Sequence, residues 1–492
     1  MPLRLRPDPR AARGGSAATA APASGSAAGG ARARRAARLA ARAATRARAG
    51  LLAGALALAL ACGPRAPDPR PSLLLVVFDT TRYDHTSLAG YARDTTPRLA
   101  ALAREGARFD LAYAPTSTTG PSHATLFTGL SPLRHGVAKN GVPLDASFET
   151  LAETLAAAGW RTAGFASSFV VSRRFGFDQG FATYDDRFER ATSTFTEAFW
   201  EGERVLEPFD RRAGATTDRA LSWLEGNAGR GPLFAFVHYF DPHAPYVPPD
   251  GYAGRFAPAG ADGLARDVAR YDEEIAFADA ELGRLLDALE RLGLASNTIV
   301  VVTADHGEGL MDHGHLEHGV HIYEEQVRVP LVVRWPGRVA ARRVGEPVEL
   351  ADVRPTVLAL LGLPAEEGAD GRSLARALLD GEPLDAERPI HLYRRHFAGE
   401  RRAGTLVKGE QLGVRVGRWK LIDAPEEGTR ELFDLEADPR ERENRLAAQP
   451  DVAATLLARL DARRRERAGE AVAPLDVSPG ERERLRALGY TE

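Results

Sequence analysis

Three clusters of polar residues follow apolar runs of the kind that form buried strands, and together they could bind a divalent cation. The first begins at Asp79, the second contains Asp241 and His243, and the third contains Asp305 and His306. In open α/β sheets, ligands bind at the carboxyl ends of the strands. Carboxylates and imidazoles are ligands for cations such as zinc or manganese. The clusters therefore predict a site for a divalent metal ion.

Thr119 is the hydroxyl residue that the sequence places best for nucleophilic attack. Pro121 follows it closely and is a residue type that suits the first turn of a helix. The unpaired N–H groups at a helix start favour an anionic oxygen. A hydroxyl that also contacts a metal ion can become a nucleophile. The simpler interpretation is that Thr119 caps the helix.

The elements that must position these residues alternate along the chain. Continuous apolar runs predict buried strands, and longer amphipathic stretches between them predict helices. The expected strands cover residues 73–78, 233–240, 298–303 and 330–333, and the expected helices cover 96–106, 147–158, 266–294 and 350–361. This alternation predicts an α/β domain with a largely parallel sheet.

Beyond about residue 386 the pattern changes to shorter strand-like pieces. Strands are expected over 413–422 and 431–435, followed by a helix over 450–465. We therefore expect a catalytic domain over residues 73–385 and a small α+β subdomain over residues 386–470. Residues 471–492 are interpreted as a weakly ordered tail or a docking helix.

The first 62 residues resemble an export leader. Residues 1–50 carry eleven Arg and one Asp, and an apolar run then ends in small residues and Cys62. This is the pattern of a signal peptide, and the terminal cysteine favours a lipoprotein anchored at Cys62. Residues 63–72 are Pro-rich and are interpreted as a linker. The expected location is the periplasm or the cell envelope.

The composition excludes several classes of protein. The chain has 492 residues, of which 44% are hydrophobic and 27% are charged, so it can form a sizeable core. The net charge of −3 argues against a general nucleic-acid binder. A single cysteine excludes an intramolecular disulfide and a Cys-rich zinc site.

Short motifs follow one another in a fixed order between residues 72 and 470. They are Asp79-Thr80-Thr81-Arg82, Pro121-Ser122 with Thr128-Gly129, Arg134-His135-Gly136-Val137, Asp305-His306-Gly307-Glu308, residues 323–330, 352–356 and 370–374, Trp419-Lys420-Leu421-Ile422 and residues 431–435. This series resembles the sulfatase family of the alkaline phosphatase superfamily. The resemblance implies an α/β/α sandwich with a mostly parallel central sheet.

The sequence departs from the sulfatase pattern at catalytic positions. The family has Cys or Ser, converted to formylglycine, where this chain has Thr119. Its Arg four residues later is His123 here, and its usual Asn after the metal-binding Asp305 is His306. Its second Asp after the first strand is Thr80. The chain therefore resembles threonine-dependent phosphodiesterases and transferases of the same superfamily.

That resemblance implies roles for individual residues. Asp79, Thr119, Asp305 and His306 would hold a first metal ion. His243 and His318, with Asp241 as a further candidate, would form a second metal or substrate site. His123, Lys139 and Asn140 would contact the transferred group, and His243 or His318 would activate water. Zinc or manganese is expected, with calcium or magnesium as alternatives.

Four functions fit these residues. The favoured one is a metal-dependent hydrolase, either a phosphodiesterase or a phosphatase, that forms a phospho-threonine at Thr119. The alternatives are a sulfuric ester hydrolase, an envelope phosphoryl-group transferase, and a non-catalytic binding or scaffold protein. The expected substrate is a small-molecule or cell-envelope phospho- or sulfo-ester.

Overall fold

The fold is taken from a computed structural model, which describes residues 70–188, 199–200, 203–204, 209–364, 368–402, 405–465 and 478–482. The predicted leader and Cys62 lie outside the described residues, as do residues 63–69 of the linker and most of the predicted tail. Among the described helices, none is both long and apolar enough to cross a membrane.

The centre of the fold is a nine-stranded sheet, in the order β10-β2-β9-β8-β1-β7-β3-β4 with β11 paired to β2. Its three middle strands are β8 (Thr298–Ala304), β1 (Ser72–Phe78) and β7 (Leu233–Tyr239), which are parallel to one another and buried along their whole length. Strands buried on both faces must be apolar throughout, which is why these runs lack polar alternation.

The outer strands complete a mixed but mostly parallel sheet. Strand β9 (Arg328–Arg334) is antiparallel to both β8 and β2. The other strands of this sheet are β2 (Ala107–Tyr113), β3 (Arg161–Phe165), β4 (Thr183–Asp185), β10 (Arg342–Val344) and β11 (Val348–Glu349). A separate pair consists of β5 (Phe199–Trp200) and β6 (Glu203–Arg204).

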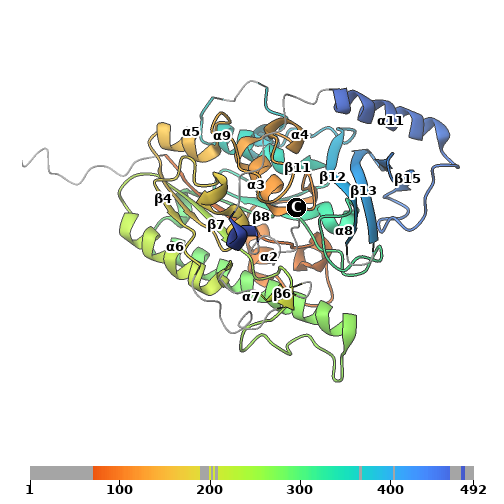
Figure 1. The fold of residues 1–492 in the computed structure, drawn as a ribbon. Helices are drawn as coiled ribbons and strands as arrows, with labels where there is room; N and C mark the ends of the chain where they lie inside the picture. The colour runs from red at the N-terminus through yellow and green to blue at the C-terminus, as the bar shows by residue number, and fades with distance from the viewer. Residues whose placement is uncertain are drawn as a thin grey trace, which may run out of the picture. The chain divides into compact units, whose positions relative to one another are not determined.

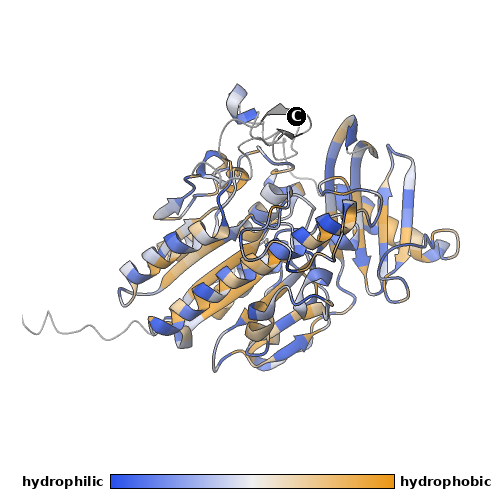
Figure 2. Cartoon of the chain, turned by 90° about the horizontal axis from the view of Figure 1, so that it is seen from below, coloured by the Kyte–Doolittle hydropathy of each residue, from blue (hydrophilic) through white to orange (hydrophobic). Residues whose placement is uncertain are grey.

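Helices cover both faces of the sheet, which confirms the predicted α/β/α arrangement. Helices α6 (Ala213–Asn227) and α7 (Gly263–Arg291) lie on one face, and α3 (Thr119–Thr128), α5 (Leu151–Ala157) and α9 (Val353–Leu360) lie on the other (Figure 1). The strands between the helices are apolar, whereas the helices are amphipathic (Figure 2). The shorter helices are α2 (Pro97–Ala103), α4 (Pro132–His135), α8 (Glu324–Val327) and α10 (Ala375–Asp380).

The C-terminal part is a four-stranded antiparallel sheet with one helix, as the change of pattern predicted. It contains β12 (Ile390–Arg402), β13 (Thr405–Val416), β14 (Trp419–Ala424), β15 (Thr429–Asp434) and α11 (Pro450–Arg465). Leu456 and Leu460 of α11 pack in a cluster with Val414 and Leu421. The single strand expected over 413–422 is divided, because a turn at Gly417, with φ of 56°, separates β13 from β14.

Candidate active site

The two central acids of the site meet because their strands are paired in register. Phe78 of β1 is the partner of Ala304 of β8. The next residues, Asp79 and Asp305, therefore lie side by side just beyond the ends of the two strands. The backbone amide of Thr80 donates a hydrogen bond to Asp305 Oδ1 at 3.1 Å. The amide of His306 donates to the same oxygen at 2.9 Å. These bonds fix one oxygen of Asp305, and its other oxygen, Oδ2, has no hydrogen-bond partner in the described structure.

Thr119 lies at the same place, as the first residue of helix α3. The N-cap position belongs to Thr118. The Thr119 side chain is fully buried, and its hydroxyl lies 3.2 Å from His306 Nε2. The hydroxyl is therefore held at a helix N-terminus, where backbone N–H groups favour negative charge on oxygen.

The tautomer of His306 is set by its neighbour. Its Nδ1 lies 2.8 Å from the carbonyl oxygen of Gly307, which can only accept a hydrogen bond, so Nδ1 carries the proton. The lone pair is then on Nε2, which lies 3.8 Å from Asp79 Oδ1 and 3.5 Å from Asp305 Oδ2. His306 therefore offers a ligand atom to the space between the two acids.

These atoms fit a divalent cation. A tetrahedral ion with ligand bonds of about 2.1 Å places neighbouring ligand atoms about 3.4 Å apart, and the distances from His306 Nε2 to Thr119 and the two carboxylates are all close to that spacing. Asp79 Oδ1 and Asp305 Oδ2 are buried without a hydrogen-bond partner in the described structure. Buried acceptors without a partner are costly unless a ligand satisfies them.

The electrostatics of the site also favour a cation. Burial, followed by the charges of Asp305 and Glu308, raises the pKa of Asp79 well above its usual value. Burial raises the pKa of Asp305 to about 6. Burial, followed by His318, lowers the pKa of His306 to about 3, so the imidazole is neutral and able to act as a ligand. A bound divalent ion would stabilise both carboxylates in their ionised form.

The imidazole ring of His318 lies between those of His306 and His243 and contacts both. The ring of His318 lies 4.5 Å from that of His306 and 4.8 Å from that of His243, measured between centroids. His318 Nδ1 lies 3.1 Å from Glu308 Oε1. His243 stacks on Phe240 with centroids 4.3 Å apart. The structure thus places both predicted histidines at the site.

His243 also has a defined tautomer. Its Nδ1 donates to the carbonyl oxygen of Ala244 at 2.6 Å, which leaves the lone pair on Nε2. That nitrogen is buried and has no hydrogen-bond partner in the described structure. Burial, followed by His318, lowers the pKa of His243 to about 3. His243 is therefore a neutral imidazole that can accept a proton.

Asp241, predicted as a further ligand, makes other contacts. Its Oδ2 accepts a hydrogen bond from the backbone amide of Ala213, the first residue of α6, at 2.7 Å. Its Oδ1 lies 3.4 Å from a guanidinium nitrogen of Arg212. In the described structure, the two groups of buried side chains whose ligand atoms lie within 4.8 Å of one another include neither Asp241 nor the other two residues predicted for the second site, His243 and His318. In this structure the Asp241 carboxylate stabilises the N-terminus of α6 by accepting this hydrogen bond.

The three residues expected to contact substrate differ in their surroundings. Asn140 is buried, and its side-chain oxygen accepts a hydrogen bond from the amide of Gly120 at 2.6 Å. Lys139 is half-buried. His123 is fully buried one turn after Thr119, and its Nδ1 donates to the Thr119 carbonyl oxygen at 2.9 Å.

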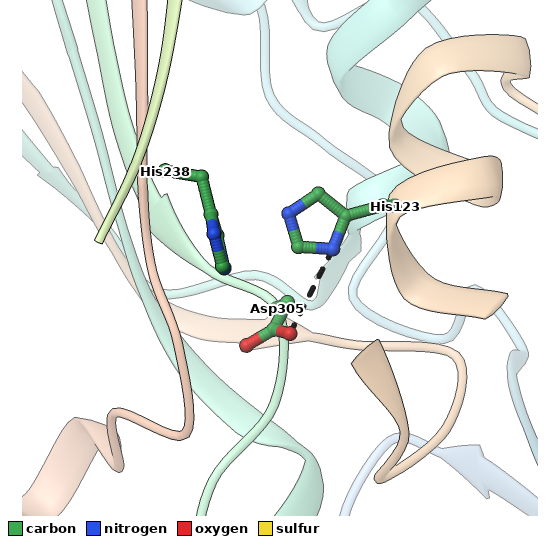
Figure 3. Close-up of side chains that lie close together, drawn as sticks. All are labelled: His123, His238 and Asp305. Atoms are coloured by element: carbon green, nitrogen blue, oxygen red, sulfur yellow. Dashed lines mark ion pairs between the residues drawn. The ribbon is translucent and has the colours of Figure 1, made fainter. Parts of the chain in front are cut away.

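His238 was not predicted from the sequence, although it lies at the centre of the site. It is a fully buried residue of β7, and its Nε2 lies 3.1 Å from Asp79 Oδ2. Figure 3 shows His238 and His123 beside Asp305. The signal was a single polar residue inside an otherwise apolar strand, Leu-Phe-Ala-Phe-Val-His-Tyr. A histidine that must be buried needs a polar partner.

Comparison with known proteins relates both parts of the chain to one group of hydrolases. Residues 71–363 match the family model of sulfatase, and residues 312–466 match the model of the N-sulphoglucosamine sulphohydrolase C-terminal region. The chain is 24% identical to N-acetylglucosamine-6-O-sulfatase of Bacteroides thetaiotaomicron, with 76% of this chain and 82% of that protein covered. It is 27% identical to the multifunctional alkaline phosphatase superfamily protein PehA of Trinickia caryophylli, with 78% and 93% covered.

A solved structure shares the fold. The phosphonate monoester hydrolase of Agrobacterium radiobacter superimposes with a TM-score of 0.69 at 24% sequence identity, over 83% of this chain and 98% of that one. At this level of identity the likeness establishes the architecture, and the chemistry must be argued from the side chains.

Proposed function

This chain belongs to the sulfatase family of hydrolases, and we propose that it cleaves phosphate esters with Thr119 as the attacking group. The observation that carries the proposal is the position of the Thr119 hydroxyl, buried at the start of α3 and 3.2 Å from His306 Nε2. A divalent cation held by Asp79, Asp305 and His306 would supply the positive charge that lowers the pKa of this hydroxyl. The expected ion is zinc or manganese.

In the first step, Thr119 Oγ1 forms a bond to phosphorus while the bond from phosphorus to the leaving oxygen breaks. The leaving oxygen takes up the proton that Thr119 has lost, and the phosphoryl group remains on the threonine. The helix start at Thr119 favours the negative charge on the attacking oxygen. The buried amide of Asn140 offers hydrogen-bond donors to oxygens of the transferred group.

In the second step, water replaces the threonine. His243 accepts a proton at Nε2 as the water oxygen forms its bond to phosphorus, and the bond from phosphorus to Thr119 Oγ1 breaks. Thr119 Oγ1 then takes up one proton and His243 releases one, which restores the threonine hydroxyl and the neutral imidazole. His243 is the candidate base because its Nδ1 is committed to the Ala244 carbonyl and its Nε2 lone pair has no other partner in the described structure. Its pKa of about 3 must rise for this role, and the negative charge of a bound phosphoryl group would raise it. His318 stands beside it, oriented through Glu308.

Hydrolysis of sulfate esters is the second candidate. The names of several relatives favour it, including the N-acetylglucosamine-6-O-sulfatase of Bacteroides thetaiotaomicron. The residue at position 119 argues against it, because the sulfatase pattern uses Cys or Ser there as the precursor of formylglycine. Threonine retains a hydroxyl nucleophile and does not provide that precursor.

The test compares three substrates with wild-type protein and with Thr119→Ala. We expect nitrophenyl phosphate or bis-nitrophenyl phosphate to turn over faster than nitrophenyl sulfate, and the ratio of monoester to diester rates distinguishes a phosphatase from a phosphodiesterase. Thr119→Ala should lower kcat by at least about a thousandfold, whereas Thr119→Ser should retain part of the rate. A Thr119→Ala variant with wild-type turnover would remove the threonine from the mechanism.

Two further outcomes separate the remaining alternatives. A phosphoryl-group transferase would give product only when an acceptor alcohol is added. A scaffold protein would show no turnover of any substrate and would not need metal for its structure. Trapping of labelled phosphate on Thr119 in acid-quenched enzyme, located by mass spectrometry, would support the covalent intermediate directly.

We also propose that the chain is exported and anchored through Cys62. The support is the sequence pattern of residues 1–62, a basic stretch followed by a short apolar run that ends at the cysteine. Fractionation of cells that express wild-type protein or Cys62→Ser tests this. Release of the variant from the membrane fraction is expected, and an unchanged distribution would contradict the anchor.

A further inference from the structure

Three arginine side chains of strand β12 gather around one phenylalanine ring. Their guanidinium carbon atoms lie 5.5, 3.6 and 5.8 Å from the ring centroid of Phe397, for Arg394, Arg395 and Arg402 respectively. Between Arg394 and Phe397, two residues of β12 oppose one residue of β13. A β-bulge of this kind changes the direction of the side chains beside it and is common next to active sites.

One of these three guanidinium groups makes no ion pair in the described structure. Arg394 pairs with Glu427 at 2.8 Å, and Arg402 pairs with Glu400 at 3.3 Å. Arg395 instead donates from Nη1 to a neutral acceptor, the carbonyl oxygen of the next residue, at 3.1 Å. Burial, followed by the charge of Arg402, lowers the pKa of Arg395 to about 10. An anion bound here would stabilise the charged guanidinium.

Two histidines of the neighbouring loop add polar atoms that the protein does not satisfy. The rings of His315 and His321 lie 5.8 Å apart, edge to face, and Nδ1 of each is buried without a hydrogen-bond partner in the described structure. Val320 packs with Phe397 in one apolar cluster, so this loop lies against β12. Burial, followed by the charge of Arg402, lowers the pKa of His315 to about 4. Buried polar atoms without a partner are rare, because a missing hydrogen bond costs free energy that a ligand can recover.

The same loop connects these residues to the proposed active site. His318 contacts the active-site imidazoles, and His315 and His321 stand three residues before and after it. The hydroxyl of Ser117 donates to the carbonyl oxygen of His321 at 2.7 Å. Ser117 is two residues before Thr119, and consecutive Cα atoms are about 3.8 Å apart. A substrate whose reacting group is at Thr119 can therefore extend to these basic residues.

We propose that Arg395, Arg402, His315 and His321, here called the basic cluster, bind a second anionic group of the substrate. This group is a phosphate, sulfate or carboxylate on the leaving group, so the substrate is an ester with further negative charge. Arg395 supplies a cation, and each neutral imidazole supplies one N–H donor to the oxygens of the anion. Arg395 and His321 are half-buried, so part of the basic cluster is accessible to solvent. The inference rests on the proposed function, because it names the leaving group of that reaction.

The test compares alkanediol bisphosphates with alkyl monophosphates of the same chain length, as substrates of zinc-loaded full-length protein. At the best chain length, the wild-type kcat/KM should be about ten- to a hundredfold higher for the bisphosphate. Arg395→Gln should bring this ratio close to the twofold that two reacting ends give. Lys408→Gln is the matched control, because it removes one positive charge from an exposed position of β13 and should keep the wild-type ratio. A twofold ratio in wild-type protein, or an unchanged ratio in Arg395→Gln, overturns the proposal.

A binding measurement separates failure of this inference from failure of the proposed function. Isothermal titration of zinc-loaded protein with alkane bisphosphonates and alkyl phosphonates, which are not hydrolysed, needs no turnover. Wild-type protein should bind the bisphosphonate at least about tenfold more tightly, and both Arg395→Gln and His315→Gln should lose most of this preference. Equal affinities in wild-type protein overturn the basic cluster. Absent ester turnover with the preference intact overturns the proposed function alone.

Discussion

The side-chain oxygen of Asn140 accepts a hydrogen bond from the backbone amide of Gly120, one residue after the proposed nucleophile, at 2.6 Å. Because the side-chain oxygen makes this bond, the side-chain nitrogen, Nδ2, points away from Gly120. Nδ2 is buried and has no hydrogen-bond partner in the described structure. Asn140 therefore joins two tasks, since it anchors the start of α3 and presents donors beside Thr119.

The two tasks can be separated by substitution. Asn140→Asp keeps an acceptor for Gly120 but removes the donors, so kcat/KM should fall by about a hundredfold or more while the melting temperature stays near that of the wild type. Asn140→Ala removes both and should lower kcat/KM and thermal stability together. Steady-state kinetics and scanning calorimetry on both variants check this. Wild-type kcat/KM in Asn140→Asp would show that the amide does not contact the transferred group.

Removal of the His306 imidazole should remove metal. His306→Gln loses the ligand atom that faces Asp79 and Asp305, so zinc affinity should fall by more than the ten- to hundredfold typical of changes to supporting residues, and turnover should fall at least about a thousandfold. His313→Gln is the control, because His313 Nδ1 binds Glu325 at 2.8 Å instead. Isothermal titration with Zn²⁺ measures both. Equal zinc affinity in the two variants would contradict the assigned ligand.

The stability of metal-free protein should depend on pH through Asp305. Its pKa is about 6 in the folded protein against 3.8 for an ordinary Asp, so the folded state holds this proton more tightly. The contribution is complete below about pH 3.8 and is lost as pH rises through 6, at a cost on the order of 3 kcal/mol. The buried histidines, whose pKa is lowered, change stability in the opposite direction over part of this range, so the Asp305 contribution is read as the difference between stripped wild-type protein and stripped Asp305→Asn, and this difference in melting temperature should decrease between pH 4.5 and 7.5.

Zinc should reverse this trend, because the ion stabilises the ionised carboxylate and its binding releases the proton. The gain in melting temperature on adding Zn²⁺ should thus grow with pH over the same range. Asp305→Asn is the control, since its side-chain oxygen can still accept from the amides of Thr80 and His306, and the stripped variant should lack the Asp305 contribution while it keeps that of the buried histidines. The same pH dependence in stripped wild-type protein and stripped Asp305→Asn would contradict the raised pKa of Asp305.

Gly307 is needed for close packing of the loop that carries His306. A Cβ added there would lie 2.0 Å from the backbone oxygen of Glu325, which cannot move without disturbing α8. Gly307→Ala should lower the free energy of unfolding by about 3 kcal/mol and reduce zinc binding. Gly345→Ala is the matched control, because nothing lies within 4 Å of its added Cβ. Urea denaturation compares the two, and equal stability would refute the packing argument.

The sequence was most informative where one physical requirement dominated. Strands β1, β7 and β8 had to be apolar along their whole length because the sheet buries both faces, and their predicted limits differ from the observed ones by a residue at most. Asp79, Asp305 and His306 followed from these strand ends. Helix α11 was also located correctly, because its proline start and its length are local features.

The sequence was least informative where a contact depends on distant residues. Asp241 has the residue type and position of a metal ligand, but Arg212 and the start of α6 are its partners, and no local pattern records that arrangement. His238 was missed because the strand that contains it is otherwise apolar, so the pattern predicted a buried strand and no site residue within it. The turn that separates β13 from β14 was overlooked because Gly417-Arg418 is flanked on both sides by residues suited to strands.

The register between β1 and β8 has a consequence for how the protein is made. Asp79 and Asp305 are 226 positions apart in the sequence, and they become neighbours only when β8 pairs with β1. Contacts at such separation form late in folding. During synthesis, about three fifths of the chain must therefore emerge before any cation can find its full set of ligands. The earlier segments must stay soluble with a sheet that lacks a central strand, so the metal can be acquired only after folding is well advanced.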